Sequence, residues 1–184
     1  MKENKLSSAF KGFIELDQVK GELEGFVNYV KSGLNDELKM VRPAMLVVAQ
    51  SEEQALLFAQ GVISILREEH LSSYYVIRPS FLWNRPISDE YDCVLVNDFD
   101  DKLAESNELE RIKKRLTRTI ECTRSNLVTI FCTTEARAQQ YREFYKEDFY
   151  KLFQSRIHLA PYTIDNIKDG AHYCFDEWAE RNEI

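Results

Sequence analysis

The feature that most constrains the fold is an apolar run that ends abruptly in acids, residues 93–101 (CVLVNDFDD). Strands that are buried on both faces have continuous apolar sequences, and they are typical of parallel sheets covered by helices. In an open α/β sheet, ligands bind beyond the carboxyl ends of the strands. The run therefore predicts a buried strand over residues 93–97, with Asn97 and Asp98 at the ligand edge of the sheet.

Similar patterns along the chain predict an α/β alternation. Apolar runs predict further strands at residues 44–49, 74–79, 127–132 and 157–159. Helical spacing of apolar residues predicts helices near 17–31, 52–67, 107–125, 135–153 and 171–181. This order predicts a three-layer α/β/α fold around a five-stranded parallel sheet.

Three of the predicted helices have distinctive sequence details. The first should begin with Asp17 as N-cap and stop at Gly33, with Gly21 and Gly25 on one face that permits close packing. Residues 51–54 (SEEQ) match a capping box at the start of the second. The fourth helix carries a set of large apolar residues, Tyr141, Phe144, Tyr145, Phe149, Leu152 and Phe153. We expect these side chains to pack in the core and at an interface rather than to form a platform on which nucleic-acid bases stack.

The chain length fits one domain, with 184 residues of which 44% are hydrophobic. We expect a flexible N-terminus over residues 1–12, an α/β domain over 13–163 and a C-terminal helix within 164–184. No apolar run is long enough to span a bilayer, and the polar first residues lack the apolar core of a signal peptide. The sequence therefore favours a cytoplasmic protein without membrane insertion.

The charge balance argues against a general nucleic-acid surface, because the formal net charge is −7. The predicted helix at 107–125 nevertheless carries five cations, Arg111, Lys113, Lys114, Arg115 and Arg118. We interpret them as a solvated face that pairs with Glu105, Glu108 and Glu110. A nucleic-acid-handling module would depend on this face alone.

The cysteines and histidines lack the spacing of a disulfide framework or a metal site. The chain contains no CxxC pair and no HExxH motif. Its cysteines and histidines are Cys93, Cys122, Cys132, Cys174, His70, His158 and His172. Cys93 and Cys132 lie in strand-like apolar runs, where a free cysteine packs as a small hydrophobe. We therefore expect neither a metal nor another cofactor.

Three segments together resemble an AAA+ ATPase domain: residues 13–23 (FIELDQVKGEL), the acidic third strand, and residues 153–157 (FQSRI). The similarity is to the group of stage V sporulation protein K, red-type rubisco activase and the AAA+ components of type VII secretion. It implies a parallel sheet in the order 5-1-4-3-2, followed by a helical lid of which residues 164–184 would be a remnant or the start. Active members of the family form rings with ATP bound between neighbouring subunits.

The family's phosphate loop, GxxxxGK[ST], should lie between the first strand and its helix. An ungapped match places the lysine at Ala55 and the hydroxyl at Leu56. The loop here, residues 50–54 (QSEEQ), has no glycine and puts Glu52 and Glu53 after Ser51, where the phosphates would lie. Those carboxylates satisfy the helix dipole themselves and would repel a triphosphate. The sequence thus predicts no nucleotide site of the family's kind.

The resemblance also gives roles to the residues at the ends of the third and fourth strands. The family's magnesium-holding Asp matches Asn97, and its catalytic Glu matches Asp98, which could still act as a base. The alternative is an acidic strand end that holds no metal. Thr133, Thr134 and Glu135 occupy the place of the family's sensor residue, although helix capping explains the threonines equally well.

Arg156 lies in a segment similar to the Ser-Arg motif with which AAA+ subunits present an arginine to the ATP of a neighbour. Such a cation stabilises the transferring phosphoryl group, whichever subunit binds the nucleotide. The alternative is an arginine that pairs with an acid at the sheet edge.

Our leading hypothesis is an inactive, nucleotide-free AAA+-like module that acts through protein contacts or self-assembly, or beside an active AAA+ ATPase. An enzyme alternative is a divergent NTPase that uses Arg78, Arg85 or a distant lysine in place of the one missing at Ala55. A variant is the degenerate motor domain of a secretion or DNA translocase, because residues 95–99 (LVNDF) are similar to its acidic strand. The helix that precedes the first strand counts against that variant.

Overall fold

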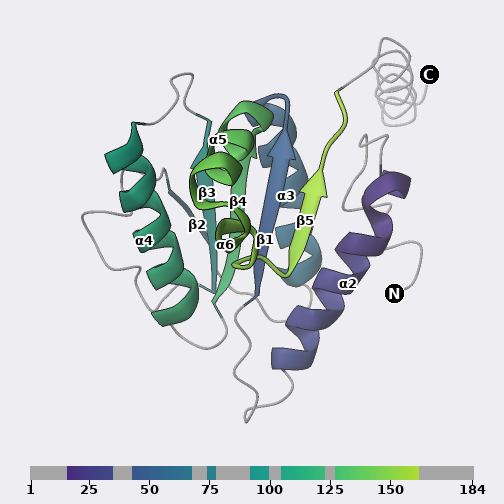
Figure 1. Ribbon diagram of the computed structural model, residues 1–184. Coiled ribbons are helices and arrows are strands. Elements are labelled where there is room, and N and C mark those ends of the chain that lie inside the picture. The colour runs from purple at the N-terminus through teal and green to yellow at the C-terminus, as the bar shows by residue number, and fades with distance from the viewer. Residues whose placement is uncertain are drawn as a thin grey trace, which may run out of the picture.

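The computed structural model describes residues 16–34, 43–67, 74–77, 92–99, 105–122 and 127–161 (Figure 1). Its strands form one five-stranded sheet in the order β2-β3-β4-β1-β5, and every neighbouring pair is parallel. The strands are β1 (Ala44–Ala49), β2 (Tyr74–Ile77), β3 (Cys93–Asp98), β4 (Val128–Thr134) and β5 (Ser155–His158). The predicted parallel sheet and its strand order are confirmed.

Helices cover both faces of the sheet (Figure 1). On one face lie α2 (Leu16–Leu34) and α3 (Glu52–Arg67), and on the other lie α4 (Ser106–Cys122), α5 (Glu135–Tyr145) and α6 (Glu147–Tyr150). Alternate residues of β1 enter the two cores: Met45 and Val47 pack toward α2 and α3, whereas Leu46 and Val48 pack toward the other helices. This is the predicted three-layer arrangement.

The start and end of α2 differ from the prediction. The helix begins at Leu16, which places Asp17 inside its first turn rather than at the N-cap, and it continues through Gly33 to Leu34. The predicted close packing of Gly21 and Gly25 is wrong, because a Cβ on either would meet no heavy atom within 4 Å. The buried stripe of α2 runs through Leu23 and Val27, so the glycine face turns away from the core.

The predicted single helix at 135–153 is wrong, because α5 and α6 are separated at Lys146. Lys146 has φ 54° and ψ −132°, a conformation that interrupts the helix and favours glycine. The break directs Phe149 into the aromatic core, where it is fully buried against Tyr141. Most of the predicted aromatic core is confirmed, but Phe144 is 38% exposed.

Replacing Lys146 by glycine is expected to raise the free energy of unfolding by about 1 kcal/mol, because glycine adopts this backbone conformation without strain. Urea unfolding curves would measure the gain. The control is Lys146→Ala, which keeps a Cβ and should bring no stabilisation. Equal effects of the two substitutions would contradict a strained backbone at this position.

Cys93 and Cys132 are buried, free thiols inside β3 and β4, as the apolar runs predicted. Burial raises the pKa of both thiols, so they stay protonated at neutral pH. Within the described ranges, no helix is long and apolar enough to cross a membrane, and no group of three or more potential metal ligands occurs. The predicted N-terminal segment 1–12 and C-terminal helix in 164–184 lie outside the described residues.

Candidate functional site

The residues matched to the family's phosphate loop, acidic strand and sensor position meet at the carboxyl edge of the sheet. The register pairs Asp98 of β3 with Thr133 of β4, and Ala49 of β1 with Thr134. Because β1, β3 and β4 are adjacent and parallel, their carboxyl ends lie together with the start of α3. This edge is where a sheet of this kind binds ligands.

The connection from β1 to α3 is closed by its own side chains. Only Gln50 and Ser51 lie between the strand and the helix. The Gln54 N–H donates to Ser51 Oγ (3.2 Å), and the Gln50 N–H donates to Gln54 Oε1 (3.2 Å). The predicted capping box is therefore present, except that Gln54 reaches Gln50 rather than Ser51 itself.

A further hydrogen bond and packing in the core fix the start of α3. Gln54 Nε2 donates to the backbone oxygen of Ala160 at 2.8 Å, which ties the helix to the chain beyond β5. Ala55 is fully buried and Leu56 is partly buried in the core, so the positions matched to the family's lysine and hydroxyl belong to the first turns of a packed helix. Within the described range 43–67, no loop is long enough to wrap a phosphate.

Glu52 and Asn97 contact each other directly across this edge. Asn97 Nδ2 donates to Glu52 Oε1, and Asn97 is itself buried at the end of β3. The contact brings a carboxylate to the first turn of α3, where the helix dipole favours negative charge. An anion that bound to this helix terminus would have to displace Glu52.

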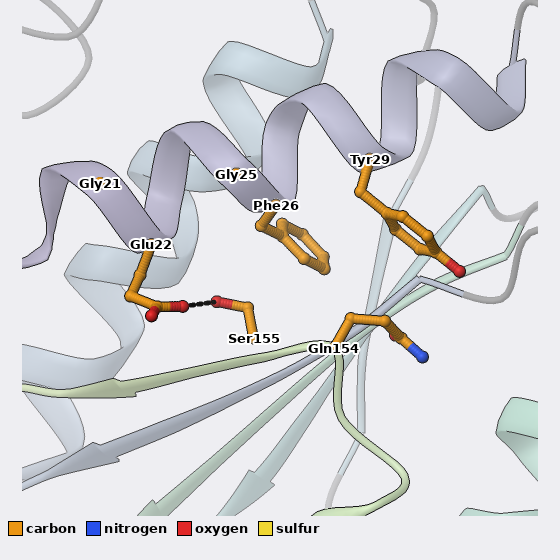
Figure 2. A pocket seen from close by; sticks show the side chains of 7 residues that line it. All are labelled: Gly21, Glu22, Gly25, Phe26, Tyr29, Gln154 and Ser155. Carbon is orange, nitrogen blue, oxygen red and sulfur yellow. Dashed lines mark hydrogen bonds between the residues drawn. The ribbon is translucent and has the colours of Figure 1, made fainter.

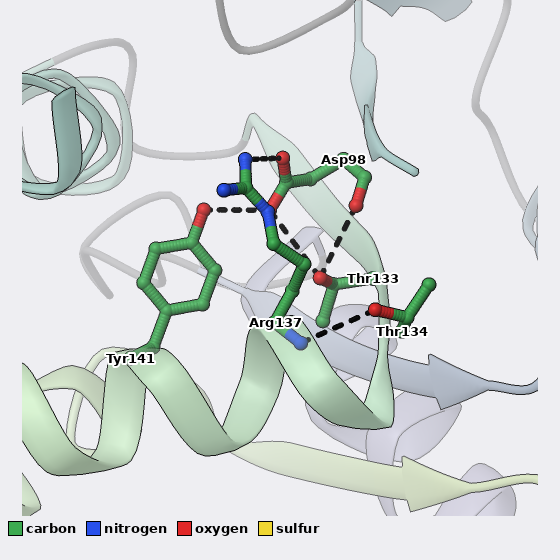
Figure 3. A network of polar contacts seen from close by, with 5 residues as sticks. All are labelled: Asp98, Thr133, Thr134, Arg137 and Tyr141. Carbon is green, nitrogen blue, oxygen red and sulfur yellow. Dashed lines mark hydrogen bonds and ion pairs between the residues drawn. The ribbon is translucent and has the colours of Figure 1, made fainter. Parts of the chain in front are cut away.

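Asp98 lies at the centre of a buried polar network (Figure 3). Arg137 Nη2 donates to Asp98 Oδ1 at 2.8 Å, and Tyr141 Oη donates to Oδ2 at 2.6 Å. Thr133 Oγ1 lies 3.3 Å from Oδ2 and 3.2 Å from the backbone oxygen of Asp98. The side chains of Arg137 and Asp98 are only 3% and 1% exposed, so the ion pair is shielded from water.

The charges in this network stabilise one another. Burial alone would lower the pKa of the Arg137 guanidinium, but the hydrogen bond and the charge of Asp98 outweigh burial and raise it. Burial, followed by the charge of Asp98, raises the pKa of the Tyr141 phenol well above its usual value. Tyr141 therefore remains a protonated donor, and both carboxylate oxygens of Asp98 are engaged.

Two residues of this site, Arg137 and Tyr141, were not predicted from the sequence to belong to it. Arg137 received no role, and Tyr141 was predicted only as a core aromatic. A usable signal existed, because Arg137 lies four residues before the predicted core residue Tyr141 and so on the same face of the helix, where a charged side chain needs a buried partner. Asp98, at the end of an apolar strand, is that partner.

The threonines at the end of β4 have structural tasks. Thr134 is the N-cap of α5 and accepts the Arg137 N–H at 3.2 Å, as the capping alternative predicted. Thr133 contacts Asp98 in the buried network. Glu135 is exposed and lies 3.5 Å from His158 Nδ1, so it forms a surface pair with β5 when the histidine is protonated. A sensor role for these residues stays a prediction.

Arg156 lies outside this cluster, in the edge strand β5 rather than just before it, because the strand begins at Ser155 instead of the predicted residue 157. Its side chain is exposed, and its guanidinium carbon lies 5.5 Å from the centroid of the Tyr150 ring. No carboxylate in the described part of the chain pairs with it. The alternative role of Arg156, an ion pair with an acid at the sheet edge, therefore has no partner residue in that part of the chain.

The remaining candidate cations divide into two groups. Arg78 and Arg85, proposed as substitutes for the missing lysine, lie outside the described residues. On α4, Lys113 Nζ lies 4.6 Å from the centroid of the Tyr145 ring, so this member of the basic face packs on the aromatic core. The predicted pairing of that face with Glu105, Glu108 and Glu110 stays a prediction.

Comparison with known proteins finds similarity among solved structures. No protein-family model matches the chain, and no curated protein matches it. Among solved structures, the chain is similar to that described as Rif2 in complex with the C-terminal domain of Rap1, with a TM-score of 0.47 and 9% sequence identity. The similarity covers 90% of this chain and 61% of the other, so the chain spans about three fifths of that structure's length.

Proposed function

We propose that this chain is an AAA+-like module that does not bind nucleotide and acts through contacts with proteins. It would either assemble with copies of itself or occupy a place beside an active ATPase subunit. The observation that carries the proposal is the contact between Glu52 and Asn97, because it joins the positions that would otherwise face the phosphates and their magnesium ion.

The geometry of the β1–α3 connection supports the absence of a phosphate site. Phosphate loops work because glycine lets several backbone N–H groups approach the phosphates while a lysine neutralises their charge. Here two residues join strand and helix, the capping box engages the Gln54 N–H, and Ala55 is buried. A triphosphate at this edge would also meet the carboxylate of Glu52 at close range.

The environment of Asp98 supports the absence of catalysis. A general base must reach the water that it activates, within hydrogen-bond distance. Both oxygens of Asp98 accept hydrogen bonds from protein side chains, and its side chain is 1% exposed. The same residue contributes to the fold by joining β3 to α5, which is the role of an acidic strand end that holds no metal.

The AAA+-like part of the proposal is supported by the strand order, which is the one that the resemblance implies, and by the helix that precedes β1. That helix favours the AAA+-like interpretation over the motor domain of a translocase. The divergent NTPase would need Glu52 to leave its place and a cation to enter from elsewhere. No contact among the described residues favours either the displacement of Glu52 or the entry of such a cation.

Arg156 is the residue through which the module could serve a neighbouring ATPase. Its exposed guanidinium lies against the Tyr150 ring, on the edge strand β5. A planar cation supplied in trans needs no nucleotide site in its own subunit. In this form of the proposal, the partner is an active AAA+ ATPase whose bound nucleotide Arg156 approaches.

Thermal melting with millimolar Mg-ATP or Mg-ADP tests the proposal. A ligand at about 100 times its Kd stabilises the folded state by about 2.7 kcal/mol. For a chain of this size, each 1 kcal/mol raises the melting temperature by about 2–4 °C. We expect no rise with either nucleotide, and a rise of several degrees would contradict the proposal.

A further inference from the structure

Strand β5 has polar or charged side chains on both of its faces. On the side toward α2, a surface groove of about 390 Å³ is lined by Glu22, Ser155 and the helix glycines Gly21 and Gly25, among others (Figure 2). There Ser155 Oγ donates to Glu22 Oε2 at 3.5 Å, so this carboxylate is already engaged. Successive side chains of a strand alternate between its faces, so Arg156 lies on the opposite side, which α5 and α6 cover.

Two arginines flank the side chain of Tyr150, the last residue of α6. The guanidinium carbon of Arg156 lies 5.5 Å from the centroid of its ring. The Tyr150 hydroxyl donates to the backbone oxygen of Ala138 at 3.4 Å. Within α5 this oxygen also accepts from the N–H four residues further on, that of Arg142. Arg142 therefore lies near the hydroxyl end of Tyr150, and Arg156 lies against its ring.

The surface formed by Arg142, Tyr150 and Arg156 carries a positive charge without a counter-charge. Both arginines are exposed. Burial raises the pKa of the Tyr150 phenol, and the charges of the two arginines oppose this rise, so both act on the same side chain. The carboxylate of Glu135 also acts on Tyr150, but its ion-pair partner is His158, at 3.5 Å. In a chain with 31 acidic and 24 basic residues, two arginines that pair with no described carboxylate favour a counter-charge from another molecule.

The chemistry of this surface favours a protein segment with spaced carboxylates. A guanidinium donates two parallel hydrogen bonds to a carboxylate, and arginine and tyrosine are enriched at the energetic centres of protein interfaces. Phosphate chains and nucleic acids concentrate negative charge, which Glu135 and the formal net charge of −7 would oppose. A protein segment can instead place acids opposite the arginines and an uncharged or basic residue opposite Glu135.

We infer that Arg142, Tyr150 and Arg156 form a docking surface for an acidic segment of a partner protein. The segment carries an Asp or Glu opposite each arginine, and Tyr150 holds Arg156 in position for this contact. This inference rests on the proposed protein-contact function, and it names the surface and the chemistry of the partner. It does not require that Arg156 approach the nucleotide of a neighbouring subunit.

A display selection with the full chain tests the inference. Random peptides of about ten residues are selected on the wild-type chain and counter-selected on the double variant Arg142→Glu, Arg156→Glu. The enriched sequences should be rich in Asp and Glu. A synthetic copy of one should lose affinity as salt is raised, because exposed charges are screened. Enrichment of sequences without acids, or no enrichment at all, would overturn the inference.

Charge reversals and their controls locate the binding surface. In fluorescence anisotropy, Arg142→Glu and Arg156→Glu should each weaken binding of the acidic peptide about tenfold or more, because repulsion replaces attraction. The controls Lys114→Glu and Arg118→Glu change the net charge equally, but on α4, which lies far from β5 (Figure 1). They should leave the affinity within about twofold. An equal loss in the controls would indicate general attraction only and overturn the assignment.

Substitutions of Tyr150 separate its support of Arg156 from its part in the fold. Tyr150→Phe keeps the ring against the guanidinium and should retain the peptide affinity, although it loses the hydrogen bond to Ala138. Tyr150→Leu keeps apolar volume but removes the ring, and it should weaken binding about two- to fivefold. Melting temperatures show whether both variants stay folded. Equal affinities of the two folded variants would overturn the role given to Tyr150.

Further outcomes separate this inference from the proposed function. If the chain forms a dimer that Arg142→Glu disrupts, the acidic segment belongs to a second copy and the inferred partner is wrong. If Mg-ATP binds and the arginine reversals abolish its binding, the surface holds phosphate, and the inference and the proposed function both fail. If Mg-ATP binds equally to the arginine variants, only the proposed function fails. If neither an acidic peptide nor Mg-ATP binds, only this inference fails.

Discussion

Replacing Asp98 by alanine is expected to lower the free energy of unfolding by about 3–5 kcal/mol, because the Arg137 guanidinium would remain buried without its counter-charge. Tyr141 and Thr133 would lose their acceptor in the same substitution. For a chain of this size, the melting temperature should fall by roughly 10 °C. Urea unfolding and thermal melts would measure the two losses.

The matched control is Asp148→Ala. Asp148 pairs with Lys151 at 3.3 Å, but both side chains are about two-thirds exposed, at 66% and 68%. Removing such a surface pair costs about 1 kcal/mol or less. If Asp98→Ala proves as mild as Asp148→Ala, Asp98 is open to water, as a catalytic base would be, and the structural role assigned to it is wrong.

A double substitution separates the ion pair from the space that it fills. Asp98→Leu combined with Arg137→Met removes both charges and keeps apolar volume in the buried site. Its loss should be smaller than the sum of the two single losses, because neither charge is then left uncompensated. Additive losses would indicate that the two side chains do not interact in solution.

Replacing Phe149 by alanine should cost about 3–5 kcal/mol, the usual range for a fully buried phenylalanine. Its ring is stacked on Tyr141 with centroids 4.6 Å apart and lies edge-on to Phe131 at 5.8 Å. Phe149 is also the buried residue of α6, which has four residues and is too short to be stable without tertiary contacts. Far-UV circular dichroism and urea unfolding would follow the loss.

Phe144 provides the control for Phe149, since it is the same residue type on the neighbouring helix and is 38% exposed. Phe144→Ala should change the free energy of unfolding by less than about 1 kcal/mol. Similar losses for the two substitutions would contradict the helix break at Lys146. An uninterrupted helix over 135–153 would place the aromatic residues on different faces from those observed.

The strands could be predicted from the sequence with most accuracy where burial is complete. All residues of β1 and β3 are buried, so a continuous apolar run identified both, with β1 at its observed bounds and β3 one residue longer at Asp98. The order of the sheet did not come from these runs. It came from the resemblance to AAA+ domains that residues 13–23, the acidic third strand and residues 153–157 carry, because periodicity alone does not say which strands are neighbours.

The features that could not be predicted depend on contacts between distant segments. The pairing of Asp98 with Arg137 requires the register of β3 against β4, which places α5 above the end of β3. The break at Lys146 arises at a residue that is not a helix breaker. Helical spacing placed Gly21 and Gly25 on one face, but only the position of α2 beside β5 turns that face toward a groove.

Above all, the carboxyl edge of this sheet is expected not to bind nucleotide. The most direct test is isothermal titration calorimetry of Mg-ATP and of Mg-ADP into the full chain. With Glu52 bonded to Asn97 and only two residues between β1 and α3, we expect only the heat of dilution for both nucleotides. Saturable heat with a micromolar Kd for either would contradict this expectation, and the chain would then have to be assayed as an ATPase.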